Sequence, residues 1–162
     1  MPKSRADSAP APPDATGLDT TRLSHLMGYA ASRAAITLRK AFARQMAPLD
    51  IRVVEFSILM LVAQNPQVNQ KQLGAELDIS APNLAVMLDR MVERGWVERV
   101  RSTADRRAQH IHLTAAGARL VQRAEKIAST MEKPALAVLS AAERALLIEL
   151  LHKVAAGRAG KR

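Results

Sequence analysis

The chain has 162 residues, about the length of one domain and long enough to bury a sizeable core. Its 24 basic and 15 acidic residues give a formal net charge of +9, which favours a polyanionic partner, nucleic acid above all. The absence of cysteine excludes disulfides, thiolate zinc sites and cysteine-based redox sensing, and an aromatic content of 2% predicts an aliphatic core.

The first 17 residues contain four prolines among small and polar residues, which predicts a flexible or polyproline-like tail over residues 1–17. Lys3 and Arg5 could contact phosphates, but a solvated tail is the simpler interpretation. The tail lacks the apolar stretch of a secretory signal, and no run of about eighteen apolar residues follows. We therefore expect a cytoplasmic protein that does not associate with a membrane.

Two helices are predicted before the middle of the chain. The first covers residues 18–47 and ends before Pro48. The second, roughly Arg52 to Gln64, is apolar nearly all round, which predicts a central position in the fold. Apolar residues recur on one face of the first helix at spacings of three and four, namely Leu23, Leu26, Met27, Ala30, Ala34 and Leu38.

A polar row interrupts the first helical pattern. His25, Tyr29 and Arg33 recur at i, i+4 and i+8, with Ser32 beside them. An arginine can hold a carboxylate bidentately while a phenol or imidazole bonds a ring substituent, so the row could form one wall of a ligand pocket. Alternatively, Arg33 is a solvated or ion-paired surface residue, and His25 and Tyr29 pack in an interface. Three apolar residues could supply the lid or floor, namely Met27, Phe56 and Met60.

A short helix is predicted after Asn65-Pro66. Asn69 can cap it, and Gln72 can reach back to the amide of the cap. Leu73 and Leu77 then share one side, whereas Lys71 and Glu76 stay exposed.

After a turn at residues 78–80, Ser80 is expected to cap a second helix whose first turn tolerates Pro82. Its predicted buried face consists of Leu84, Met87, Leu88, Met91 and Val92. Its opposite face consists of Pro82, Asn83, Val86, Asp89, Arg90 and Glu93. A recognition helix needs this division, because one side must pack on the domain while the other lies in the major groove. Ser80, Pro82, Asn83, Val86 and Arg90 are therefore candidate DNA-binding residues, although any surface helix also has a polar face.

A β-hairpin is predicted next. Gly95 ends the helix, Trp96 to Arg101 alternates like a strand, residues 102–105 have turn chemistry, and Ile111 and Leu113 alternate with two histidines. The tip carries Asp105, Arg106 and Arg107. Arginine on a thin projection suits the narrow minor groove, and Asp105 can hold the loop in shape.

Two helices follow the hairpin. Thr114 can cap the first, and Ser140 with Glu143 forms a capping box for the second. Leucine and other apolar residues line both helices. Burial against a second copy is the simplest explanation, and a twofold dimer would place two recognition helices one DNA turn apart.

The segment LGAELDISAPNLAVMLDRMVERGWVERVRSTADRRAQHIHLT resembles the core of the MarR family of bacterial transcriptional regulators. The family's wing signature is matched by Asp105, Arg107, Leu113 and Thr114, and weaker similarity extends from about Leu23 to about Val154. The resemblance implies a homodimer that binds a palindromic operator on double-stranded DNA, usually as a repressor. It also implies that a small molecule often releases the operator, and many such effectors are aromatic acids.

The expected fold is mainly α with a small β-hairpin. Residues 18–157 would form a single domain, in which 52–114 make a winged helix-turn-helix and 18–47 and 115–157 are long dimerisation helices. We hypothesise that a small aromatic carboxylate binds His25, Tyr29, Ser32 and Arg33 and shifts the dimer away from its operator-competent spacing. A regulator of the same family without an effector is the alternative.

Other functional classes fit less well. No Gly-rich phosphate loop, His-Glu-x-x-His motif or other convergent catalytic set is present, so we do not predict an enzyme, a cofactor or a catalytic residue. His110 and His112 share a strand face, but no third ligand is near in sequence, so a metal site is not predicted. A helical protein-interaction module is possible, but it leaves the arginine-tipped hairpin without a purpose.

Overall fold

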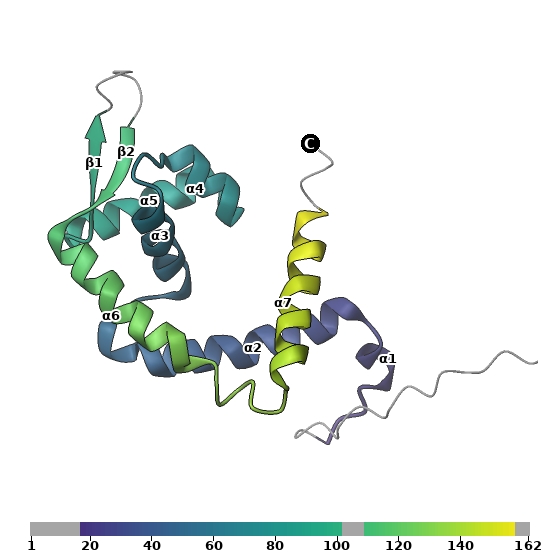
Figure 1. The fold of residues 1–162 in the computed structure, drawn as a ribbon. Coiled ribbons are helices and arrows are strands. Elements are labelled where there is room, and N and C mark those ends of the chain that lie inside the picture. Colours follow the sequence, from purple (N-terminus) through teal and green to yellow (C-terminus); the bar gives the residue numbers. More distant parts are fainter. Residues whose placement is uncertain (1–16, 102–108, 158–162) are drawn as a thin grey trace, which may run out of the picture. The chain divides into compact units, whose positions relative to one another are not determined.

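The computed structural model describes residues 17–101 and 109–157 of the chain. The fold divides into two compact units, residues 1–38 and residues 39–162, and the boundary falls within α2. Figure 1 shows helices as the dominant element, together with one antiparallel hairpin. The prediction of a mainly α fold with a small β-hairpin is confirmed.

The first unit contains α1 (Thr21–Ser24) and the first part of α2 (Met27–Met46). The expected continuous helix over residues 18–47 is therefore wrong in its first part. The chain leaves helical geometry after Ser24, and a tight bond from the Leu26 amide to the Leu23 carbonyl (2.9 Å) closes the turn. Four helical residues with no buried side chain have no packing to hold them in a longer helix, and Gly28 is a poor helix former just beyond the break.

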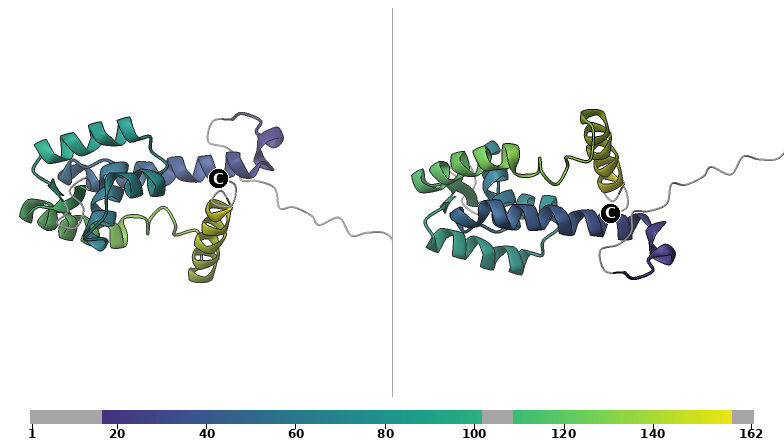
Figure 2. Two further views of the ribbon diagram at one scale, coloured as in Figure 1. Left: turned by 90° about the horizontal axis from the view of Figure 1, so that it is seen from above. Right: turned by 90° about the horizontal axis from the view of Figure 1, so that it is seen from below.

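The second unit contains the end of α2, a 3₁₀ turn η1 (Ala47–Leu49), α3 (Val53–Gln64), α4 (Gln70–Leu77) and α5 (Ala81–Glu93). The hairpin strands β1 (Val97–Arg101) and β2 (Gln109–Leu113) follow, and then α6 (Ala115–Met131) and α7 (Ala141–Ala156). Pro48 lies inside η1 and ends α2 as predicted. The two views of Figure 2 show α3, α4, α5 and α6 gathered around the base of the hairpin.

The core of the second unit is formed where α3 packs against α6 and β2. Ile58 and Leu59 are completely buried, which confirms the predicted central position of α3. Phe42 at the end of α2 meets Phe56 edge to face, with 5.5 Å between ring centroids. Every buried side chain among the described residues is apolar, and most are aliphatic.

Three helix starts follow the side-chain bonds that the sequence predicts. Asn69 accepts from the Gln72 amide at 3.0 Å while Gln72 accepts from the Asn69 amide at 3.0 Å. Thr114 accepts from the Gly117 amide at 3.0 Å at the start of α6. Ser140 and Glu143 bond reciprocally at the start of α7, and the amide of Ser140 is the main reason that the pKa of Glu143 lies below its ordinary value.

The base of the hairpin packs against the helices. Val97 pairs with Leu113 and Arg101 with Gln109 in an antiparallel register. The Ile111 amide also donates to the Val68 carbonyl at 2.8 Å, and Asn69 and His110 form an isolated bridge. The loop between α3 and α4 therefore adds a third, short edge to the hairpin. The alternation of apolar and polar residues in the sequence did not predict this edge, because it is only one bridge long.

Gly117 lies where α6 passes the chain that links α5 to β1. A Cβ atom at this position would be 1.9 Å from the carbonyl oxygen of Trp96 and 2.9 Å from its carbonyl carbon. Both neighbours are backbone atoms, which cannot rotate away. Only glycine therefore allows α6 to start this close to the hairpin.

We predict that Gly117→Ala lowers the free energy of unfolding by about 2 to 4 kcal/mol, because backbone must shift to admit the methyl group. Urea unfolding followed by circular dichroism measures the change. Gly28→Ala is the control, since nothing lies within 4 Å of its Cβ and alanine is the better helix former. Equal stability of Gly117→Ala and the wild type would contradict the close approach.

Candidate nucleic-acid interface

Helix α5 has one buried and one exposed face. Leu84, Leu88 and Met91 are completely buried, and Met87 is half-buried. The opposite face is exposed throughout, and its residues are those predicted: Pro82, Asn83, Val86, Asp89, Arg90 and Glu93. Val86 leaves 50% of its surface exposed despite being apolar, so it is available to contact a partner.

The prediction that Val92 belongs to the buried face is wrong, because this residue is 38% exposed. Eight residues after Leu84, the helix has turned about 80° past two full turns. The side chain therefore lies at the edge of the buried stripe, near the end of the helix, where little packs over it.

The prediction that the Ser80 side chain caps α5 is also wrong. Ser80 occupies the N-cap position with an extended backbone, but its hydroxyl makes no capping bond. Pro82 at the second helical position has no amide hydrogen, which leaves the Asn83 amide at the third position as the one a cap could bond, and the Ser80 hydroxyl does not bond it. The backbone carbonyl of Ser80 instead accepts from the Leu84 amide at 3.0 Å.

A left-handed residue and two hydrogen bonds fix the turn before α5. Asp78 ends α4 with φ of 53°, a conformation that aspartate tolerates better than most residues. The Ile79 amide donates to the Gly74 carbonyl at 2.9 Å, and the Gln70 amide group donates to the Ala81 carbonyl at 3.2 Å. The turn thus holds the start of α5 against α4.

The other end of α5 is fixed as well. Gly95 has φ of 67°, and the amides of Gly95 and Trp96 donate to the carbonyls of Val92 and Met91 at 2.8 and 2.9 Å. This is the Schellman pattern, which ends a helix at a left-handed glycine. The prediction that Gly95 ends the helix is confirmed.

Arg94 ties this end to the loop before α3. Its guanidinium donates to the Asp50 carboxylate at 2.8 Å and lies 3.7 Å from the ring centroid of Trp96. Asp50 itself has a left-handed backbone, with φ of 49°. No sequence pattern indicates this cluster, because Arg94 and Asp50 are 44 residues apart.

A second ion pair joins α5 to the hairpin. Arg99 of β1 donates to the Asp89 carboxylate at 2.5 Å. Sequence spacing gave no sign of this contact either, because it depends on how β1 packs against α5. The exposed face of α5 and the hairpin are therefore connected by a side-chain bond in addition to the backbone.

His110 has a structural partner. Its Nδ1 lies 2.6 Å from the carbonyl oxygen of Gln67, and its ring meets that of His112 edge to face at 6.4 Å. Among residues 17–101 and 109–157, no group of three histidine, aspartate or glutamate side chains is arranged to hold a metal ion.

The predicted hairpin tip, Asp105 with Arg106 and Arg107, lies outside the described residues. Of the described residues, β1 ends at Arg101 and β2 begins at Gln109 (Figure 1).

The candidate ligand residues lie in the first unit. His25 follows α1 as its C-cap and is not part of α2, so the three residues of the row do not share one regular helix. Tyr29 is half-buried and Arg33 is exposed, both on α2. Ser32 is exposed and donates to the Gly28 carbonyl at 2.8 Å.

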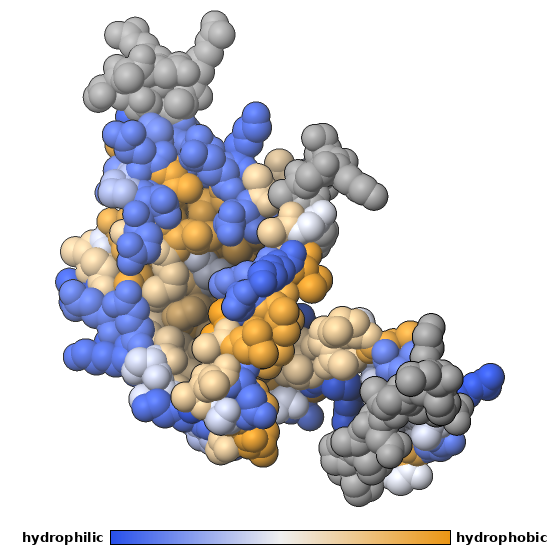
Figure 3. Space-filling view, turned by 45° about the vertical axis from the view of Figure 1, so that its right-hand side comes forward, coloured by the Kyte–Doolittle hydropathy of each residue, from blue (hydrophilic) through white to orange (hydrophobic). Residues whose placement is uncertain are grey.

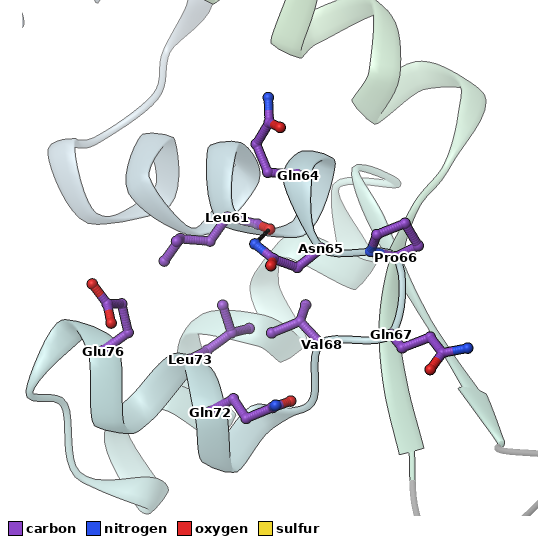
Figure 4. Close-up of a pocket in the computed structure, with 9 residues that line it drawn as sticks. All are labelled: Leu61, Gln64, Asn65, Pro66, Gln67, Val68, Gln72, Leu73 and Glu76. Atoms are coloured by element: carbon purple, nitrogen blue, oxygen red, sulfur yellow. Dashed lines mark hydrogen bonds between the residues drawn. The ribbon is translucent and has the colours of Figure 1, made fainter.

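A pocket in the second unit lies between the end of α3 and α4, as Figure 4 shows. Leu61, Val68 and Leu73 point toward one another at its floor, whereas Gln64 and Gln67 point away. The side-chain amide Nδ2 of Asn65 donates to the Leu61 carbonyl at 2.8 Å, so this polar group is already used to end α3. None of the four candidate ligand residues lines this pocket.

The geometry is that of a winged helix-turn-helix: α4 and α5 joined by a fixed turn, followed by a two-stranded hairpin. The sequence model of the MarR family matches residues 51–108. The structure of the transcriptional repressor CouR bound to a 23-mer DNA duplex superposes with a TM-score of 0.80 at 34% identity, covering 85% of this chain and 98% of that one. CouR bound to p-coumaroyl-CoA superposes with a TM-score of 0.78 at 32% identity, covering 85% and 97%.

The putative transcriptional regulatory protein for the hcr operon of Thauera aromatica is 27% identical over 129 residues, which are 79% of this chain and 78% of that protein. The chain belongs to the MarR family and is a DNA-binding transcriptional regulator. The relatives are regulators, in agreement with the prediction that the chain is not an enzyme. Among the described residues, no helix is long and apolar enough to cross a membrane.

Proposed function

We propose that the protein is a dimeric repressor that binds a palindromic operator and leaves it when a small aromatic carboxylate binds. The observation that carries the proposal is the exposed face of α5, held at both ends on a winged helix-turn-helix. In this proposal α5 is the recognition helix in the major groove, and Arg106 and Arg107 at the hairpin tip enter the adjacent minor groove.

The contacts on α5 divide by chemistry. Asn83 can bond an adenine edge through both atoms of its amide, and Val86 can contact a thymine methyl group. We propose that Ser80 and Arg90 contact phosphates and that Pro82 shapes the start of the helix. Asp105 would hold the tip in the shape that directs Arg107 toward the groove. The solved complex of CouR with a DNA duplex supports duplex DNA as the partner.

Dimerisation is supported by apolar surface that the chain leaves exposed, part of which appears in orange in Figure 3. In α7, Leu147 is 41% and Leu151 is 48% exposed, and no residue of the helix is buried. Leu23 and Leu26 in the first unit are 44% and 45% exposed. Burial of such surface contributes about 25 cal/mol per Å², which favours association with a second copy.

The proposal thus assigns residues 18–47 and 115–157 to dimerisation and residues 52–114 to DNA binding, within one domain of residues 18–157. A twofold axis would then repeat the recognition helix about one DNA turn away, which explains why a palindromic operator is expected. The exposed apolar residues of α7 would become part of the dimer core.

The effector proposal rests on Tyr29, Ser32 and Arg33 of α2 and on His25 just before it. The guanidinium would hold the carboxylate, and the phenol and imidazole would bond ring substituents. CouR was solved with p-coumaroyl-CoA, which combines an aromatic acid with a thioester to CoA. This neighbour supports an aromatic acyl group in the effector, and the tests below separate the free acid from its thioester.

We predict that Asn83→Ala weakens binding to a duplex from the protein's own promoter by about 1 to 3 kcal/mol and affects a random duplex much less. Arg90→Ala should weaken both duplexes alike and reduce the salt dependence by about one released ion, because it removes a phosphate contact. Fluorescence anisotropy at several salt concentrations measures both effects. Equal losses on the two duplexes for Asn83→Ala would remove it from base recognition.

We predict that Leu147→Glu with Leu151→Glu converts the dimer to monomers and reduces affinity for the promoter duplex. Two carboxylates cannot be buried in an apolar interface at low cost. Sedimentation velocity measures the mass. Gln64→Glu with Gln67→Glu adds the same charge at exposed positions outside the proposed dimerisation segments and should remain dimeric. A double leucine variant that sediments like the wild type would place the interface elsewhere.

We predict that 4-hydroxycinnamate or its CoA thioester raises the melting temperature of the wild type and releases the promoter duplex, and that Arg33→Ala loses most of this response. Arg39→Ala, an exposed arginine of the same helix, is the charge-matched control. A response to the thioester alone would identify the acyl-CoA as the effector class and would contradict the proposed carboxylate, because a thioester has no free carboxylate for Arg33 to hold. A response in Arg33→Ala equal to that of the wild type would exclude the proposed carboxylate clamp.

A further inference from the structure

The ion pair between Asp89 of α5 and Arg99 of β1 lies at the edge of the packed core. Side chains alternate along a strand, so Arg99 shares a face with Val97, which is 1% exposed and belongs to the core beside α5. Arg99 continues this face outward and donates from Nη1 to Oδ1 of Asp89 at 2.5 Å. The Arg99 side chain is 29% exposed and that of Asp89 is 55% exposed. The pair therefore lies at the boundary between packed core and open surface.

Asp89 is the acidic residue in the middle of the exposed face of α5. It comes one turn after Val86 and directly before Arg90, both of which the proposed function places toward DNA. A carboxylate at this place would be repelled by the phosphates on both sides of the groove. Its charge has to be balanced if the helix is to approach the duplex closely.

We propose that Arg99 is a positioning residue for duplex binding, which neutralises Asp89 and ties the recognition helix to the hairpin strand. The proposal rests on the proposed function of α5. Arg99 would act through Asp89 and not through a contact of its own with the duplex. With the pair formed, Arg99 and Asp89 together present no net charge to the phosphates.

The energetics of such pairs separate this role from a purely structural one. An ion pair that is about one-third to one-half exposed contributes little to folding, because water already solvates both groups. Its loss should therefore leave the unfolding transition almost unchanged. The phosphate charges of a bound duplex, by contrast, act on any net charge left at this surface.

Two other roles make different predictions for the same residues. Asp89 could accept a bond from a cytosine amino group, in which case its loss would weaken binding to the promoter selectively. Arg99 could bond a phosphate directly, in which case restoring the charge balance at Asp89 would not compensate for its loss. A double-mutant cycle distinguishes both from the proposal.

The variants are Arg99→Gln, Asp89→Asn and the combination of the two, which keep the approximate size of each side chain. Anisotropy titrations with the promoter duplex and with a random duplex measure affinity in the full-length protein. We expect Arg99→Gln to bind both duplexes about three- to tenfold more weakly, and Asp89→Asn to bind both more tightly by a similar factor. The double variant should lie within about twofold of the wild type, because its net charge is restored.

Arg123→Gln is the control for total charge. Arg123 is exposed on α6, and this substitution removes the same charge at a different place. It should change affinity less than Arg99→Gln. Thermal unfolding of each variant establishes that the fold is retained, and Arg99→Lys provides a second variant that keeps the charge and should keep most of the affinity.

A double variant that binds as weakly as Arg99→Gln would overturn the proposal, and so would an Arg99→Gln variant that binds like the wild type. A selective loss on the promoter in Asp89→Asn would instead assign Asp89 to base recognition. Because the expected effect is also present on random duplex, it can be measured even if the protein shows no preference for its own promoter. Absence of that preference would count against the proposed function and not against the ion pair.

Discussion

The backbone of Trp96 is the point through which the DNA-binding unit is held together. Its amide ends α5 by donating to the Met91 carbonyl, and its carbonyl accepts from the Thr114 amide at 3.1 Å. The Thr114 hydroxyl donates to the neighbouring Gly95 carbonyl at 2.6 Å, and Gly117 passes against the Trp96 carbonyl without room for a side chain. The end of the recognition helix, both hairpin strands and the start of α6 therefore meet within a few bonds. A groove-binding helix needs this kind of fixation, because a small misplacement of its end would separate its side chains from the bases.

Two ion pairs connect elements of this DNA-binding unit. Arg94 pairs with Asp50 and covers Trp96, and Arg99 pairs with Asp89 on the exposed face of α5. Both arginines are thereby engaged within the protein. The net charge of +9 is then available for phosphates at other positions, among them Arg90 and the arginines predicted at the hairpin tip. In our proposal, affinity for DNA and positioning of the recognition helix are therefore assigned to different arginines.

Local signals predicted much of the fold from sequence. The capping pairs at Asn69, Thr114 and Ser140, the glycine at position 95 and the alternation of β1 are all short-range patterns, and each appears in the structure. Where prediction failed, a second influence competed with the pattern. Pro82 removed one of the two amides that Ser80 could have capped, and the helix rotation carried Val92 to the edge of the buried face. The break at His25 follows from missing packing, with the poor helix former Gly28 just beyond it. The ion pairs of Arg94 and Arg99 could not be predicted, since they join residues that only the fold brings together.

The central claim is that the exposed face of α5 and the hairpin beside it form the surface that meets a duplex. Backbone amide resonances followed by NMR during titration with the promoter duplex test this claim most directly. The account predicts that the largest shift changes occur from Asn83 to Arg90 and along β1, with α7 little affected. Large changes along α7 combined with unchanged resonances in α5 would contradict it.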